Sequence, residues 1–258
     1  KPIGQFYGYK TLGLYQVEDF DYNAKDQTYT LKEGIPYMSG TFNRSDIRPG
    51  MWKFDDRNGD KVIDDSDMTV IGNANPDFYG GLNNQFKYKG WDFSFFFTFS
   101  YGGEVLNATK LTNTKTATTN YSVLNIANSS NRWMTVNSEG QLITDPEEMA
   151  AINAGRTVAC IYDMEMGDKY IHSWAVEDAS YLRLSNLSLG YTFDRKKLRK
   201  FNVQSLRLYF TGSNLFVWTP YSGFDPEVST KGNSLTPGVD YGAYPRNRSY
   251  VFGLNITF

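Results

Sequence analysis

The sequence predicts an all-β fold made of six long antiparallel strands that cross a membrane. Three observations lead to this prediction. Apolar and polar residues alternate in six segments, these segments are long for strands, and short and long connections alternate between them. Together they favour the wall of a large outer-membrane β-barrel with long extracellular loops.

Each segment has the period of two that arises when successive side chains point to opposite faces of a strand. Strands of globular proteins average about five or six residues, whereas about ten residues tilted near 45° cross a bilayer. The sequence has no run of roughly eighteen apolar residues, which a transmembrane helix would need. The predicted strands cover residues 5–16, 77–88, 91–101, 181–193, 203–217 and 248–258.

The third segment shows the pattern most clearly. Residues 91–101 read WDFSFFFTFSY, so every odd-numbered residue is aromatic and every even-numbered one except Phe96 is small or polar. We expect lipid on the aromatic face and a polar lumen on the other. The segment before it continues the apolar wall across a turn at Lys89-Gly90, through Phe78, Leu82, Phe86 and Tyr88.

The connections are of two kinds. The turn at residues 89–90 and the basic segment 194–202 are short. The other connections are long and cover about residues 17–76, 102–180 and 218–247. Because outer-membrane barrels have short periplasmic turns and long outer loops, we expect these three connections to be extracellular.

The last segment supports the same arrangement. It places alternating apolar residues on one face and ends at Phe258. A final strand that ends on an outward aromatic residue resembles the C-terminal assembly signal of outer-membrane barrel proteins. If Phe258 lies at the periplasmic end, alternating strand directions place residues 17–76 outside the cell.

Composition excludes several functions. The 26 Lys and Arg residues nearly balance the 28 Asp and Glu residues, so no basic surface for nucleic acid is expected. One cysteine, Cys160, excludes an internal disulfide, and with one histidine, His172, it cannot form a zinc site by itself. The motifs of serine hydrolases, P-loop proteins and zinc proteases are absent. We therefore assign no catalytic residue and expect no enzyme.

One segment has the spacing of a calcium loop. Residues 56–67 read DRNGDKVIDDSD, with oxygen-bearing side chains at loop positions that bind a hard cation such as Ca²⁺. Lys61 stands where that pattern has Gly, and the last ligand is Asp instead of Glu. The alternative is a turn whose carboxylates bond their own backbone. The predicted ligands of a structural Ca²⁺ ion are Asp56, Asn58, Asp60, Val62 through its carbonyl, Asp64 and Asp67.

The long connections contain further signals. Thr144 or Asp145 as the cap, Pro146 in the first turn and Gly155 as the stop predict a short helix. The Thr- and Asn-rich residues 107–122 predict an exposed loop. Aromatic residues in these connections can stack on sugar rings or grip peptide side chains, or can instead pack the loops together. The candidate substrate-binding residues are Trp133, Tyr162, Trp174, Tyr221, Phe224 and Tyr241.

An ordered series of blocks resembles the C-terminal part of SusC/RagA-type TonB-dependent outer-membrane transporters. The blocks include GQFYGYKTLGLYQ, RPGMWKFDDRNGDKVIDDSDMTVIGNANPDFYGGLNNQFKYKGWDFSFFF, NRW, WAVEDASYLRLSNLSLGYTF, LRLYFTGSNLFVWTPYSGFDPEVS and YPRNRSYVFGLNITF. The resemblance implies a barrel of roughly 22 strands with a plugged lumen, in the outer membrane of a Gram-negative bacterium. Residues 1–258 would form its C-terminal segment, without the plug domain.

The resemblance also implies partners. They are the remainder of the barrel and the plug, the TonB complex, which the missing N-terminal part would contact, outer-membrane lipid, and a SusD-like surface lipoprotein. Together they would import oligosaccharides or peptides. The alternative function is a secreted, calcium-stabilised β-sandwich that binds glycans, which predicts shorter strands and a soluble protein. A carbohydrate-active enzyme would need a pair of carboxylates in a cleft, which no spacing indicates.

Overall fold

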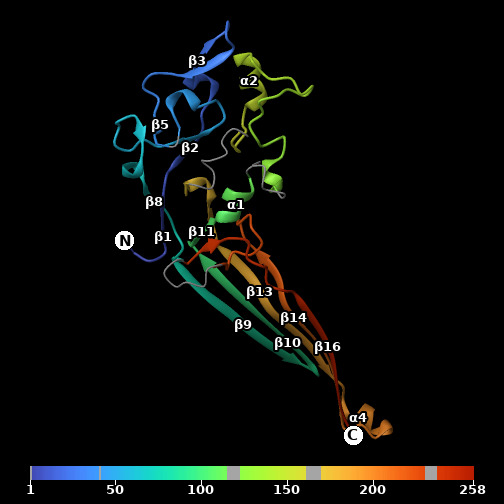
Figure 1. Cartoon of the computed structure of the whole chain (residues 1–258). Helices are drawn as coiled ribbons and strands as arrows, with labels where there is room; N and C mark the ends of the chain where they lie inside the picture. Colours follow the sequence, from blue (N-terminus) through green and yellow to red (C-terminus); the bar gives the residue numbers. More distant parts are fainter. Residues whose placement is uncertain (1, 41, 115–122, 161–169, 230–236) are drawn as a thin grey trace. The chain divides into compact units, whose positions relative to one another are not determined.

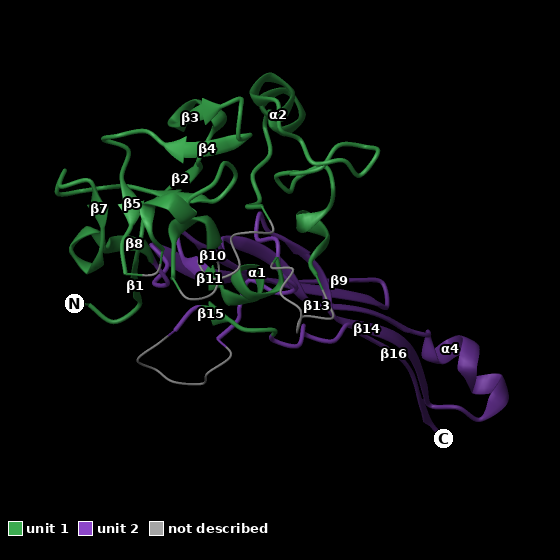
Figure 2. Cartoon of the chain, turned by 45° about the horizontal axis from the view of Figure 1, so that its top comes forward, with its two compact units in different colours: residues 1–72, 106–176, 239–242 green, residues 73–105, 177–238, 243–258 purple. Residues whose placement is uncertain are grey.

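The structure is a computed structural model of the 258-residue chain, and it describes residues 2–40, 42–114, 123–160, 170–229 and 237–258. The chain divides into two compact units, shown in different colours in Figure 2. Unit 1 comprises residues 1–72, 106–176 and 239–242, and unit 2 comprises residues 73–105, 177–238 and 243–258. No helix among the described residues is long and apolar enough to cross a bilayer.

Strands dominate the described secondary structure, and helices are few and short. The strands are β1 (Gln5–Gly8), β2 (Thr11–Leu14), β3 (Phe20–Asn23), β4 (Thr28–Leu31), β5 (Tyr37–Met38), β6 (Trp52–Phe54), β7 (Val62–Ile63), β8 (Thr69–Asn73), β9 (Phe78–Tyr88), β10 (Trp91–Tyr101), β11 (Glu104–Asn107), β12 (Val176–Asp178), β13 (Tyr181–Thr192), β14 (Ser205–Trp218), β15 (Val239–Asp240) and β16 (Ser249–Thr257). The α-helices are α1 (Ala108–Asn113), α2 (Pro146–Asn153) and α4 (Arg195–Leu198).

Unit 2 contains the five long strands side by side in one antiparallel sheet (Figure 1). Their order is β16-β14-β13-β10-β9. Five of the six predicted spanning strands are thus confirmed, with ends that differ by at most two residues. The all-β fold is confirmed as well.

The turn between β9 and β10 follows from its two residues. Trp91 pairs with Tyr88, which leaves only Lys89 and Gly90 to reverse the chain. Both have positive φ angles, 45° and 91°. A two-residue turn of this kind matches the twist of the strands it joins and favours Gly.

The predicted sixth strand, residues 5–16, is wrong. This segment forms β1 and β2, which pair with β8 and β6 in unit 1 and add nothing to the long sheet. Leu14 and Tyr15 are consecutive and both buried, so burial in this segment does not alternate as it would in a strand with one face in lipid. The register between β2 and β6 also shifts near Gly13, whose φ angle is 99°. The alternation in the sequence continues through a break that splits the strand.

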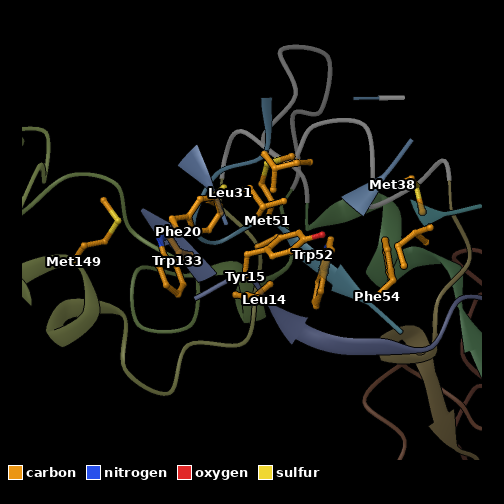
Figure 3. Close-up of a cluster of buried hydrophobic side chains, with 14 of the residues drawn as sticks. Leu14, Tyr15, Phe20, Leu31, Met38, Met51, Trp52, Phe54, Trp133 and Met149 are labelled. Carbon is orange, nitrogen blue, oxygen red and sulfur yellow. The ribbon is translucent and has the colours of Figure 1, made fainter. Parts of the chain in front are cut away.

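Unit 1 has short strands around an aromatic core. Trp52 lies at its centre, with ring centroids 4.8 Å from His172 and 4.9 Å from Trp174. Figure 3 shows part of this core. The buried residues come from widely separated parts of the chain and include Leu14, Tyr15, Phe20, Leu31, Met38, Ile47, Met51, Phe54, Trp133 and Met149.

The two helix expectations have different outcomes. Helix α2 is confirmed: the backbone N–H of Glu148 donates to Asp145 at its start, and Gly155 follows its end with a positive φ angle. Residues 107–122 are not simply an exposed loop, because α1 occupies 108–113. Asn107 accepts from the backbone N–H of Lys110 at 2.9 Å, and Leu111 is buried. Residues 115–122 lie outside the described residues.

Candidate functional site

The long sheet has one apolar face. Strand pairing places the odd-numbered aromatics of β10 opposite apolar residues of its neighbours, such as Phe86 opposite Phe93 and Leu187 opposite Phe95. Cross-strand partners share a face, and the pairing extends this face over all five strands. The apolar face comprises Phe78, Leu82, Phe86, Tyr88, Trp91, Phe93, Phe95, Phe97, Phe99, Tyr101, Leu182, Leu184, Leu187, Leu189, Tyr191, Leu206, Leu208, Phe210, Phe216, Trp218, Tyr250, Phe252, Leu254 and Ile256.

This face is not covered by unit 2 itself. Phe252 is 80% exposed, and large side chains are exposed on all five strands. A β-sandwich would bury such a face against a second sheet. The one polar side chain in its middle is Asn84, which pairs with Phe95. A continuous exposed face of this size requires an apolar surrounding.

Aromatic residues lie at both ends of the apolar face. At the turn end, the rings of Trp91 and Tyr191 are 4.7 Å apart. At the other end, Phe78 stacks on Tyr101 at 5.2 Å, and Trp218 follows Phe216 on β14. Two such bands are the arrangement of the interfacial girdles of membrane barrels.

The opposite face is polar. Asp92, Ser94, Thr98 and Ser100 of β10 lie on it, with Phe96 as the apolar exception that the sequence predicts. Its partners on β13 and β14 include Asn186, Ser188, Thr211 and Ser213. Serine and threonine hydroxyls meet across strands, for example Thr98 and Ser185 at 2.8 Å.

An ion pair on the polar face links β14 to β10 across β13, near the turn at residues 89–90. Arg207 of β14 donates two hydrogen bonds to Asp92 of β10, at 2.7 Å and 3.3 Å, across the intervening β13. The residue of β13 between them is Gly190. A Cβ atom there would lie 2.5 Å from Nη2 of Arg207 and 2.6 Å from the Asp92 oxygens. Glycine is therefore needed for the two side chains to meet.

A second charged cluster lies near the other end. Arg183 of β13 is only 3% exposed and forms ion pairs with Asp225 at 2.6 Å and with Glu227 at 3.0 Å. Glu227 also pairs with Arg246 at 3.3 Å. Buried charges are stable only when paired in this way. The cluster fastens the connection after β14 to the polar face.

A hollow of about 820 Å³ adjoins this cluster within unit 2. Its lining combines rings, amides and charges, including Tyr79, Phe96, Asn186, Asn214, Glu227 and Arg246. Sequence reasoning missed the charged groups of both clusters. Lone charges in otherwise uncharged spanning strands, such as Asp92 and Arg207, were the available signal.

The predicted metal loop is a closed turn in this structure. Asp67 is buried and accepts the backbone N–H groups of Arg57 at 2.8 Å and Asp64 at 3.0 Å. Asp56 accepts those of Gly59 and Lys61. Hydrogen bonds from Ser66 lower the pKa of Asp64.

The carboxylates thus bond their own backbone, as in the alternative reading of this segment. Among the described residues, no three or more His, Cys, Asp or Glu side chains are grouped so as to hold a metal ion. Calcium binding by Asp56, Asn58, Asp60, Val62, Asp64 and Asp67 stays a prediction.

The predicted substrate aromatics are not gathered in one place. Trp133 is 2% exposed and belongs with Trp174 to the packed interior of unit 1, whereas the buried Tyr221 packs on Val105 and Val228 in unit 2. Phe224 and Tyr241 are exposed. Tyr162 lies outside the described residues. Substrate contact by any of these residues stays a prediction.

Long antiparallel strands, one exposed apolar face and one charged polar face together define the wall of a membrane β-barrel. Comparison with known proteins agrees. The chain is 35% identical, over its whole length, to a part that makes up 22% of TonB-dependent receptor P3 of Formosa agariphila. It is 30% identical over 80% of its length to TonB-dependent receptor SusC of Bacteroides thetaiotaomicron, of which it covers 17%. No protein-family model matches the chain.

A solved structure shows the same fold. The RagAB peptide importer in its closed-closed state matches 98% of this chain and 23% of its own, with a TM-score of 0.58 and 19% sequence identity. The chain belongs to the TonB-dependent receptors of the SusC/RagA type and forms part of their barrel. It spans about a fifth of the length of these relatives. The relatives are receptors and importers, so the expectation that the chain is no enzyme is confirmed.

Proposed function

We propose that the protein containing this chain is a TonB-dependent transporter of a Gram-negative outer membrane. The observation that carries this proposal is the continuous apolar face, which runs over five paired strands and has large exposed side chains on each of them. Lipid covers this face, and the polar face lines the lumen. The remaining strands and the plug come from other parts of the protein.

The connections set the orientation in this proposal. The turn at residues 89–90 and the segment 194–202 lie at the periplasmic end, where barrels have short links. The long connections 17–76, 102–180 and 218–247 are extracellular. Most of unit 1 comes from the first two, so unit 1 is an extracellular structure.

The polar face suits a polar solute. The hollow of unit 2 offers amides and the Glu227–Arg246 ion pair, which can hydrogen-bond to hydroxyl or amide groups. Oligosaccharides and peptides both present such groups. One relative is named SusC and the solved neighbour is a peptide importer, which supports import together with a SusD-like surface lipoprotein.

Fractionation tests the membrane placement. The full-length receptor, produced in a Gram-negative host, should appear in the outer-membrane fraction as a band whose gel mobility changes on heating. The secreted β-sandwich alternative predicts a soluble protein that folds without detergent. A folded, soluble full-length protein would rule out the transporter.

Uptake tests the transport step. Cells that carry the receptor should accumulate a fluorescent oligosaccharide or oligopeptide, and deletion of the host's TonB should abolish the accumulation. The matched control is the same receptor without its TonB-contacting segment. Uptake that is equal in all three strains would contradict a TonB-dependent mechanism.

A further inference from the structure

The connection between β13 and β14 concentrates positive charge. Five of the chain's 26 Lys and Arg residues lie in residues 194–202, which we call the basic turn: Arg195, Lys196, Lys197, Arg199 and Lys200. All five side chains are exposed. The single carboxylate, Asp194, accepts the backbone N–H of Lys196 at 2.9 Å and so caps α4. The basic turn therefore presents a net positive surface to its surroundings.

The basic turn begins where the apolar face ends. Phe193, directly before it, packs edge-on against Tyr191 of the apolar face at 4.9 Å. After it, β14 returns to that face with Leu206, opposite Ile256. Figure 1 shows α4 at the end of the sheet where the C-terminus lies. The cations thus lie directly beyond the last lipid-facing side chains, at the level of lipid headgroups.

The fold holds this surface in place. The backbone N–H of Phe193 donates to Leu206 at 3.0 Å, and that of Gln204 donates to Thr257 at 2.7 Å. Leu198 is buried beneath the turn. Phe201 is instead 74% exposed, an apolar ring among the cations. Exposed rings beside Lys and Arg are the composition of a membrane-interface anchor.

We propose that the basic turn binds the phosphate groups of anionic phospholipids in the periplasmic leaflet. Clusters of four to eight basic residues next to a membrane bind anionic headgroups in this way. Phe201 enters the acyl boundary beside them. An acidic protein or peptidoglycan would match the charge, but neither accounts for the exposed ring or for continuity with the apolar face. The inference rests on the proposed function, since it requires the sheet to lie in a bilayer.

Native mass spectrometry of the full-length receptor in detergent tests this proposal. Titration with phosphatidylglycerol should show binding that phosphatidylethanolamine does not match. Replacing all five basic residues by Gln should lower the affinity for phosphatidylglycerol at least about tenfold, since each cation contributes about fivefold at a membrane surface and two such contributions already exceed tenfold. The charge-preserving double variant Arg195→Lys with Arg199→Lys should keep the affinity. This variant separates the effect of charge from that of a disturbed turn.

The outcomes separate the two proposals. A heat-modifiable outer-membrane receptor that binds both lipids equally, or whose five-Gln variant keeps its affinity, would overturn the lipid inference alone. Loss of co-sedimentation with peptidoglycan in the five-Gln variant, with lipid binding unchanged, would assign the basic turn to peptidoglycan instead. A receptor absent from the outer membrane would overturn the proposed function and this inference together.

Discussion

Phe95→Lys should destabilise the barrel far more than the same change at the next residue, Ser94→Lys. Phe95 lies on the apolar face, opposite Leu187 and Asn84, and Ser94 lies on the polar face, opposite Ser188. The two positions are adjacent on one strand and differ in the face they occupy. The comparison therefore isolates lipid contact from any general effect of a new charge.

The expected cost of Phe95→Lys follows from the depth of residue 95 in the bilayer. Eleven residues of β10 at about 3.3 Å each, tilted by about 40°, span roughly 28 Å, close to the apolar band of about 25 Å. Phe95 is four residues from Trp91, which places it roughly 10 Å inside the band. A lysine near the midplane costs about 2–4 kcal/mol. The lost ring contacts with Phe93 at 5.7 Å and Phe97 at 5.5 Å add about 1 kcal/mol.

The assay is the guanidinium dependence of folding of the full-length receptor in lipid vesicles. Phe95→Lys should shift the midpoint by the equivalent of about 3–5 kcal/mol, whereas Ser94→Lys should cost less than about 1 kcal/mol, because its charge reaches a watery lumen. A neutral result for Phe95→Lys, or equal costs for the two variants, would refute the assignment of the faces.

Three further predictions concern unit 1, the polar face and the acidic loop. Burial, and secondly the Lys110 cation, lower the pKa of His172 to about 3. In the unfolded state His172 takes up a proton below about pH 6.5, whereas in the folded state it stays neutral down to about pH 3. This residue should therefore leave the free energy of unfolding unchanged above neutral pH. Between pH 6.5 and 3 it should lower that free energy by up to about 1.4 kcal/mol per pH unit. His172→Phe should remove this part of the acid slope in thermal melts, and an unchanged slope would show another cause. Gly190→Ala should lower the free energy of unfolding by about 1 kcal/mol, because the new methyl group displaces the Arg207–Asp92 ion pair. In an Asp92→Ala background, where this pair is absent, the same change should have no cost. Equal costs in denaturant titrations of the two backgrounds would show that Gly190 is not needed for the ion pair. Millimolar Ca²⁺, the range in which extracellular calcium modules bind the ion, should raise the Tm. Lys61→Gly should raise the Tm both with and without Ca²⁺, because Gly adopts the positive φ of 69° at lower cost. No rise on addition of Ca²⁺ to either protein would make residues 56–67 an ordinary turn.

The sequence predicts the long sheet well because its information is local. Side chains of a spanning strand point alternately to lipid and to the lumen, so the face of each residue in β10 can be predicted from whether its number is odd or even. This alternation does not hold for residues 5–16, where the consecutive residues Leu14 and Tyr15 are both buried in unit 1. That burial depends on chain segments that no local pattern connects.

Long-range contacts explain what the sequence did not predict. The Tyr29 hydroxyl donates to the carbonyl of Thr144, 115 residues away, and the Arg207–Asp92 pair spans the same separation. Trp133 looked like a loop aromatic because the core around it is assembled from distant turns. The sequence spacing of the carboxylates in residues 56–67 matches a calcium loop. It could not show that backbone N–H groups donate hydrogen bonds to these carboxylates.

In the proposed barrel, one face of the long sheet meets lipid and the other meets water. The direct measurement is nitroxide accessibility along β10 of the full-length receptor in lipid, one cysteine at a time, with the buried Cys160 replaced by Ala. Collisions with oxygen, which concentrates in lipid, should peak at Phe93, Phe95 and Phe97, and collisions with a water-soluble nickel chelate at Ser94 and Thr98. Accessibility without this period of two, or nickel access at the aromatic positions, would contradict the account.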